Sequence, residues 1–263
     1  MITRKWGNLD SYKGNLRKLL QLANKCPNLV HFSLGMPFTP EGSVNLVNSK
    51  GRKVGDWSFL SRLKSFQLSY PLYSKGAMVT QNQSCNQREL VNIFRRLNPE
   101  KLEDFGLHIT GRARLWMEVL HKLQSEAPGV FKKVTKLRLP RNSPNTRPGF
   151  ILLACECFQL KYLDFYLHNY HNDFTHLAKL HRSLVTLFMR ADTELTPITE
   201  YTMKKMPIFK KVTAVRIAPG VNAETFPRNF LSRVFPNADP YLSTSQTPDN
   251  NIFEDETMKF LTG

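Results

Sequence analysis

The residues best suited to bind a metal ion gather in one short stretch of the chain. Four of the seven histidines, His168, His171, His176 and His181, fall within 14 residues, and Asp173 lies among them. Imidazole and carboxylate groups are ligands for zinc and other divalent ions. The stretch follows a predicted strand, however, so no helix aligns these side chains, and no cysteine pair completes a structural zinc site. We therefore favour an ordinary polar loop and predict no metal, with a metal site as the alternative.

The cysteines indicate neither catalysis nor disulfide bonding. Cys155 and Cys157 are separated by one residue, which is not the C-x-x-C spacing of zinc ribbons and thioredoxin-like proteins. The sequence offers no base close to them, no glycine-rich phosphate loop and no Gly-x-Ser-x-Gly elbow. With Cys26 and Cys85 they are too few and too unevenly placed for a secreted disulfide scaffold. We predict a non-catalytic protein without a cofactor, located in the cytoplasm or the nucleus.

The distribution of charged residues along the chain indicates the kind of partner. The chain has 37 Lys and Arg against 21 Asp and Glu, and the whole excess lies in the first 150 residues. This bias favours an acidic or phosphorylated protein partner, with nucleic acid as a weaker alternative. No apolar run is long enough to span a bilayer, so we expect no membrane partner. Four basic pairs either oppose helix dipoles at helix ends or form a phosphate-binding strip: Arg95-Arg96, Lys132-Lys133, Lys204-Lys205 and Lys210-Lys211.

A recurring apolar pattern predicts the elements that position these residues. The pattern is apolar, two variable, apolar, one variable, apolar. Its copies begin at Leu29, Leu63, Leu102, Val134, Leu160, Leu184 and Val212, with a weak eighth copy at Ala238. Helical patterns, for example over residues 87–97 and 112–126, fill the gaps between copies. One strand per unit requires parallel neighbours, so we predict a curved α/β solenoid of seven or eight irregular repeats, with the strands on its concave face.

The repeat carries a further signature at its start. Residues 26–29 read Cys-Pro-Asn-Leu, and residues 157–160 and 235–238 are related to them. Together with the L-x-x-L-x-L pattern, these residues resemble the cysteine-containing leucine-rich repeats of F-box proteins, which are substrate receptors of cullin-based ubiquitin ligases. The resemblance implies a leucine-rich-repeat domain over residues 1–245 and substrate recognition for an SCF-like ligase, with a Skp-type adaptor and a cullin as partners. No F-box pattern is present, so the F-box lies outside this chain or the protein is a stand-alone scaffold or adaptor.

The variable positions of the pattern predict a binding face, because they point away from the core. Aromatic and arginine side chains, which protein interfaces favour, occur together at its centre. The predicted partner-binding residues are Lys64, Gln67, Lys136, Arg138, Lys161, Tyr162, Asp164, Phe188, Arg190 and Arg216. A sheet face covered only by solvent is the alternative.

Segments outside the repeat pattern complete the prediction. Long connections are expected at residues 35–57, 69–86 and 140–148, and such loops often lie beside the binding face of a repeat protein. Residues 246–263 form either a polar tail or a C-terminal cap. We prefer a cap for residues 252–261, because the last repeat of an open array needs its apolar edge covered.

Overall fold

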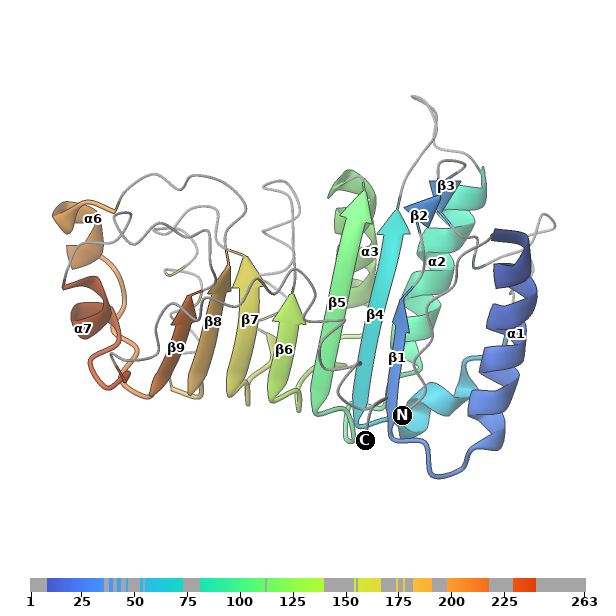
Figure 1. The fold of residues 1–263 in the computed structure, drawn as a ribbon, viewed down its shortest axis with the longest axis horizontal. Coiled ribbons are helices and arrows are strands. Elements are labelled where there is room, and N and C mark those ends of the chain that lie inside the picture. The colour runs from blue at the N-terminus through green and yellow to red at the C-terminus, as the bar shows by residue number, and fades with distance from the viewer. Residues whose placement is uncertain are drawn as a thin grey trace.

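Each of the seven clear copies of the sequence pattern forms one strand of a single parallel sheet in this computed structural model (Figure 1). The strands are β1 (His31–Gly35), β4 (Ser65–Leu72), β5 (Asp104–Gly111), β6 (Lys136–Leu139), β7 (Tyr162–Tyr166), β8 (Thr186–Arg190) and β9 (Ala214–Ile217). Every strand begins two residues after the first apolar position of its copy and pairs with the strand of the next copy. The fold is therefore α/β with an open, all-parallel seven-stranded sheet, and the sequence predicts the place of each strand correctly.

The structure describes residues 9–35, 38–39, 42–43, 55–72, 81–111, 113–139, 156–166, 182–190, 198–217 and 229–239, together with Leu46, Lys53, Ala154, Phe174 and Leu177. Three predictions concern parts of the chain outside these residues. They are the long connection at 140–148, the histidine cluster between 168 and 181, and the tail or cap at 246–263.

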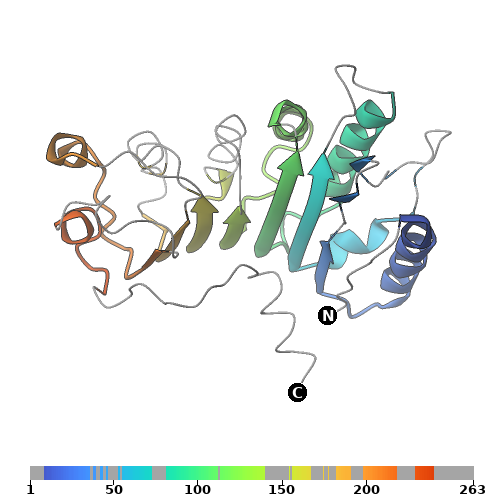
Figure 2. The same ribbon diagram turned by 45° about the horizontal axis from the view of Figure 1, so that its top comes forward.

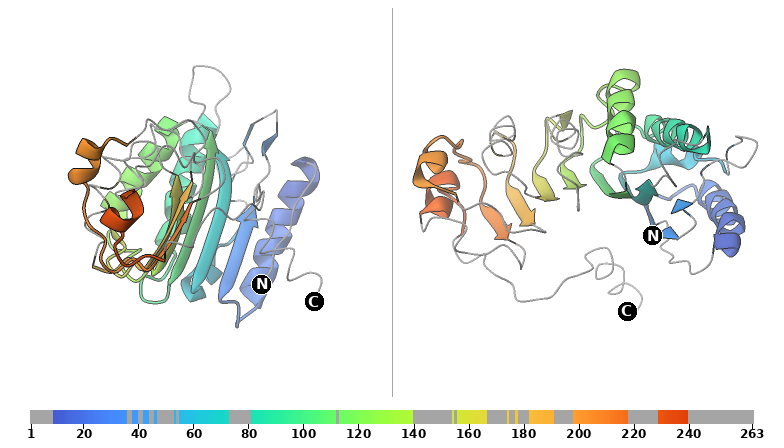
Figure 3. Two further views of the ribbon diagram at one scale, coloured as in Figure 1. Left: turned by 60° about the vertical axis from the view of Figure 1, so that its left-hand side comes forward. Right: turned by 90° about the horizontal axis from the view of Figure 1, so that it is seen from above.

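Helices lie along one side of the sheet, as Figure 2 and Figure 3 show. The described helices are α1 (Leu9–Lys25), η1 (Ser58–Arg62), α2 (Gln81–Arg95), α3 (Ala113–Glu126), α6 (Glu200–Lys204) and α7 (Phe230–Val234). The start of α3 agrees with the predicted helix, whereas α2 begins six residues before the predicted start at 87. Residues 69–86 are therefore not one long connection, because β4 continues to Leu72 and α2 begins at Gln81. In the connection at 35–57, β2 (Phe38–Thr39) and β3 (Gly42–Ser43) form an antiparallel pair.

The core lies between the sheet and the helices. Phe32, Phe66 and Phe105 occupy the same register position on adjacent strands and are almost fully buried. The ring centroids of Phe32 and Phe66 are 6.4 Å apart, and those of Phe66 and Phe105 are 6.3 Å apart. Leu137 and Leu163 continue this row on β6 and β7. The row shows why the apolar positions recur, since each strand contributes one side chain to the same buried layer.

In the units of β4, β6, β7 and β9, a recurring turn explains the apolar residue three positions before the pattern. Its carbonyl oxygen accepts a hydrogen bond from the first apolar residue of the copy, for example from Leu160 N to Cys157 O at 3.0 Å. The side chain of Cys157 is fully buried, as its position in the repeat predicts. Residues at the same position with the same bond and a buried side chain are Leu60, Phe131, Phe209 and Phe235.

Backbone hydrogen bonds continue between units just before the strands. Val30 O accepts from Lys64 N at 2.8 Å and from Ser65 N at 3.1 Å, and the same pair of bonds recurs at each following unit as far as β9. Asp239 N then donates to Thr213 O at 3.1 Å. The weak eighth copy thus continues this hydrogen-bond ladder by one residue beyond β9.

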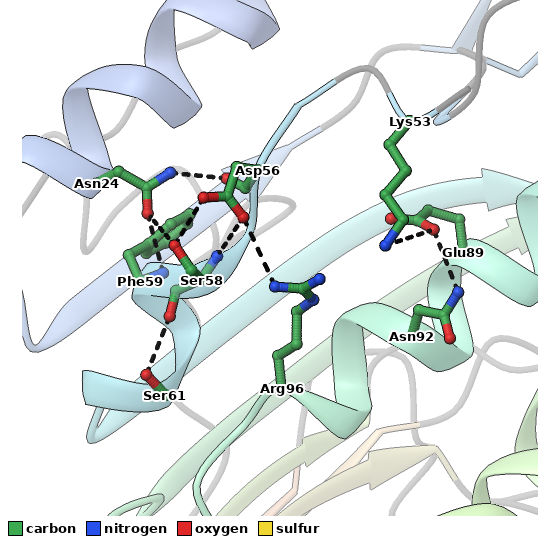
Figure 4. Close-up of polar contacts among 9 residues, drawn as sticks. All are labelled: Asn24, Lys53, Asp56, Ser58, Phe59, Ser61, Glu89, Asn92 and Arg96. Carbon is green, nitrogen blue, oxygen red and sulfur yellow. Dashed lines mark hydrogen bonds and ion pairs between the residues drawn. The ribbon is translucent and has the colours of Figure 1, made fainter.

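Side chains connect the first two units, as Figure 4 shows. The side chain of Asn24, near the end of α1, donates to Asp56 O at 2.9 Å and accepts from Phe59 N at 3.1 Å. From η1, Arg62 Nη2 donates to Ala23 O and Cys26 O, both at 3.1 Å. Both carbonyl oxygens also accept a backbone hydrogen bond, so Arg62 supplies a second donor at this helix end and opposes the negative pole of the helix.

Candidate protein-binding face of the sheet

The side of the sheet opposite the described helices is the candidate binding surface, and we term it the open face (Figure 3). Residues in register lie side by side on it, with neighbouring strands about 4.8 Å apart. Its central row is Gln67, Gly106, Arg138, Asp164, Phe188 and Arg216. The row nearer the strand starts is Ser65, Asp104, Lys136, Tyr162, Thr186 and Ala214.

Seven of the ten predicted partner-binding residues lie in these two rows. Lys64 and Lys161 precede their strands by one residue and belong to the hydrogen-bonded ladder at the edge where the strands begin. We term this the entry edge of the sheet. Arg190 is the last residue of β8 and pairs with Tyr166, and its side chain lies outside the described part. The structure thus brings the predicted residues to one face and its adjoining edge.

Arg138 and Asp164 are less available to a partner than their position suggests. Arg138 Nη2 lies 3.5 Å from Asp104 Oδ2, and Arg138 is only 8% exposed. Asp164 is the register neighbour of Arg138 on β7 and is 3% exposed. A charge buried to this degree is expensive unless it is compensated, so Arg138 mainly neutralises its acidic neighbours. The sequence pattern identifies the face correctly but gives no sign that these two residues are buried on it.

The aromatic residues of the face are half-buried. Lys136 Nζ lies 5.1 Å from the centroid of the Tyr162 ring, which is a cation–π geometry. Phe188 lies one strand further along, beside Asp164 in the central row. Part of each aromatic surface thus remains available for a partner. Aromatic anchors beside charged groups are the composition of interface hot spots.

Gly106 interrupts the central row on β5. A Cβ atom built at this position would approach Gln67 Cγ to 3.0 Å, so the side chain of Gln67 lies against the glycine. Sequence reasoning did not select Gly106 or Asp104 for the site. The repeat pattern places both at variable positions of the face. Their roles depend on neighbours in other units, on Gln67 and Arg138 respectively, which the local sequence does not show.

The basic pairs in the first half of the chain already have acidic partners. Arg95 Nη1 lies 3.2 Å from Glu126 Oε2, and Arg96 Nη1 lies 3.6 Å from Asp56 Oδ1 (Figure 4). Arg95 ends α2, so the predicted place at a helix end is correct for this pair. These contacts join successive units, and they leave fewer free cations for a phosphate strip than the charge count suggests.

Lys132 and Lys133 share a single carboxylate. Both bind Glu100 of the preceding unit, with Lys133 Nζ 2.7 Å from Glu100 Oε2. Hydrogen bonds from Lys132 and then Lys133 lower the pKa of Glu100 from 4.5 to about 2. The two lysines lie in the turn before β6, beyond the end of α3, so the prediction of a helix end is wrong for this pair.

The described residues contain no group of three or more His, Cys, Asp or Glu that could hold a metal ion. The predicted alternative of a histidine site cannot be placed, since His168, His171, Asp173, His176 and His181 lie outside them. Among the helices of the described segments, none has the length and hydrophobicity needed to cross a membrane.

Comparison with known proteins assigns no family. No protein-family model matches the chain, and no curated protein matches it. The functional argument therefore depends on the open face itself.

Proposed function

We propose that this chain is a leucine-rich-repeat protein whose open face binds a partner protein without catalysis. The observation that carries the proposal is the register of the sheet. It aligns the variable positions of successive sequence copies into continuous rows, with Lys136, Tyr162 and Phe188 on three adjacent strands. Seven parallel strands in chain order, four of them preceded by the same buried turn, support the repeat class.

A protein partner fits this face better than nucleic acid. The two rows combine aromatic rings with charges of both signs, since Asp104 and Asp164 accompany Arg138 and Arg216. Nucleic-acid surfaces are strongly basic, because phosphate contacts supply most of the affinity. Mixed charge around aromatic anchors is instead typical of protein interfaces.

The cysteine-containing repeat pattern supports a more specific proposal. In this proposal the open face recognises the substrate of a cullin-type, SCF-like ubiquitin ligase in the cytoplasm or the nucleus. An F-box outside this chain would then recruit the Skp-type adaptor. A scaffold or adaptor without a ubiquitin role is the second candidate.

Affinity purification from nuclease-treated cell extract, with co-purifying proteins identified by mass spectrometry, tests both levels of the proposal. A Skp-type adaptor and a cullin would support the ligase role, whereas one stoichiometric protein without them would support the adaptor. The double variant Tyr162→Ala/Phe188→Ala should lower partner recovery about tenfold. Tyr201→Ala is the matched control, because Tyr201 is an exposed aromatic residue on α6. If the double variant recovers the same proteins as the wild type, the open face is not the binding surface.

A further inference from the structure

Free cations gather at the entry edge of β7, β8 and β9. Lys161, Arg182, Lys210 and Lys211 are exposed, and none forms an ion pair with an acidic side chain of the described residues. In earlier units some cations of the equivalent edge are paired, for example Lys64 with Glu103 at 3.9 Å. The charge count along the sequence does not mark this group, because it places the basic excess in the first 150 residues.

Equivalent positions in successive turns bring these cations close to one another. Leu160 N donates to Cys157 O and Val212 N donates to Phe209 O, so the turns before β7 and β9 have the same geometry. Phe158 follows Cys157, and Lys210 follows Phe209, the residues whose carbonyl groups accept these bonds. Arg182 stands four residues before the start of β8, as Phe158 and Lys210 stand four residues before the starts of β7 and β9. Three adjacent strands span only about 10 Å. The cations therefore form one compact positive surface.

An exposed aromatic residue accompanies this charge. Phe158 is 73% exposed, the largest exposed fraction of any large apolar side chain in the described residues. Val185, in the ladder between Lys161 and Thr213, is also exposed. We term the surface formed by Phe158, Lys161, Arg182, Lys210 and Lys211 the basic edge. Its composition suits a ligand that carries carboxylates next to apolar side chains.

Nearby acidic groups do little to offset the basic edge. Asp164 is buried on the open face beside Arg138. Glu156 precedes the turn to β7, and burial raises its pKa, opposed by a hydrogen bond with Gln124. Asp239 is exposed beside β9 and has an interaction of its own. Among the described residues, the four cations near these strand starts still outnumber Glu156 and Asp239.

The chain itself carries a segment of complementary chemistry. Residues 252–256 read Ile-Phe-Glu-Asp-Glu, and residues 246–263 hold four acidic side chains and one lysine. The described part ends at Asp239, whose backbone N is bonded to Thr213 O at this same edge. The 13 residues from Asp239 to Ile252 can extend over about 45 Å, several times the width of the basic edge. Attachment to the same chain also gives an effective concentration on the order of millimolar, so weak contacts suffice.

We propose that residues 252–256 bind in cis to the basic edge, with their carboxylates at Lys161, Arg182, Lys210 and Lys211 and their apolar residues against Phe158. The contact differs from a cap on the last repeat, since it lies across the starts of three strands. Of the residues predicted to bind a partner, only Lys161 belongs to the basic edge.

Carbodiimide crosslinking of the full chain, followed by peptide mass spectrometry, tests this proposal. The reagent joins a lysine amine to a carboxylate only when the two are in contact. We expect links from Lys161, Lys210 and Lys211 to Glu254, Asp255 and Glu256 at low salt, and their loss at high salt as the charges are screened. The Lys133–Glu100 contact, at 2.7 Å, is the internal positive control. A mixture of isotope-labelled and unlabelled chains separates links within one molecule from links between two.

Matched variants make the outcome decisive. The reagent does not react with arginine, so Arg182→Gln weakens the attraction for the acidic segment without removing a linkable group. The variant should lower the yield of links from Lys210 and Lys211 about threefold. Arg17→Gln, which removes an exposed arginine on α1, should leave the yield unchanged. The proposal is overturned if the links from residues 254–256 are spread equally over exposed lysines such as Lys18 and Lys122 while the Lys133–Glu100 link forms. Links that form mainly between molecules would also overturn it.

Discussion

Replacing Arg138 by methionine should destabilise the sheet, although the residue lies on the open face. The variant removes the guanidinium that lies 3.5 Å from Asp104 and keeps an unbranched apolar side chain in place of the aliphatic part of arginine. Removing one partner of a fully buried ion pair costs about 3–5 kcal/mol. The side chain of Asp104 retains 23% exposure, so water recovers part of this energy. We therefore expect a loss of about 2 kcal/mol in the free energy of unfolding.

Urea unfolding followed by circular dichroism measures this loss. Lys136→Met is the matched control, because Lys136 stands two residues earlier on the same strand and contacts the half-buried ring of Tyr162. Its loss should stay below about 1 kcal/mol. Adding Asp104→Asn to the Arg138→Met variant should restore part of the stability, since it removes the uncompensated carboxylate. If Arg138→Met is no more destabilising than Lys136→Met, the ion pair does not organise the face and the reasoning fails.

Three further measurements test other parts of the structure. Leu163→Asp places a charge at a fully buried position in β7 and should lower the free energy of unfolding by several kcal/mol. Far-ultraviolet circular dichroism should therefore show an unfolded chain, and a folded variant would contradict the core assignment. Glu100→Gln should lower the urea midpoint above pH 4.5 but not near pH 2. The pKa of Glu100 is lowered from 4.5 to about 2, so its contribution to stability is lost as the pH falls through this range. Equal midpoints of the variant and the wild type at pH 7 would refute the contact. Arg62→Met should speed hydrogen exchange at the C-terminal end of α1 but not in α3, and unchanged exchange would show that Arg62 does not hold this helix end.

The sequence by itself determines the framework of this protein. A strand contributes apolar side chains to one face at every second position, so the pattern beginning at Leu160 predicts both β7 and its buried residues Leu163 and Phe165. The same periodicity predicts which residues share the open face, and the register confirms this for Tyr162 and Asp164. These inferences succeed because burial and strand geometry are local and repeat in each unit.

Only the tertiary structure decides how charges pair across units. Glu100 lies more than 30 residues from Lys132, and Arg138 is 34 residues from Asp104, yet each pair meets because parallel strands stack equivalent positions. A count of charges along the chain therefore places the basic excess in the first half. The structure pairs cations of the first half, such as Arg95 and Lys133, with acidic groups of neighbouring units. The cations beside β7 to β9, near Phe158, have no such pair within the described residues. Charge pairing depends on distance in space, and a distance between units is fixed only when the sheet forms.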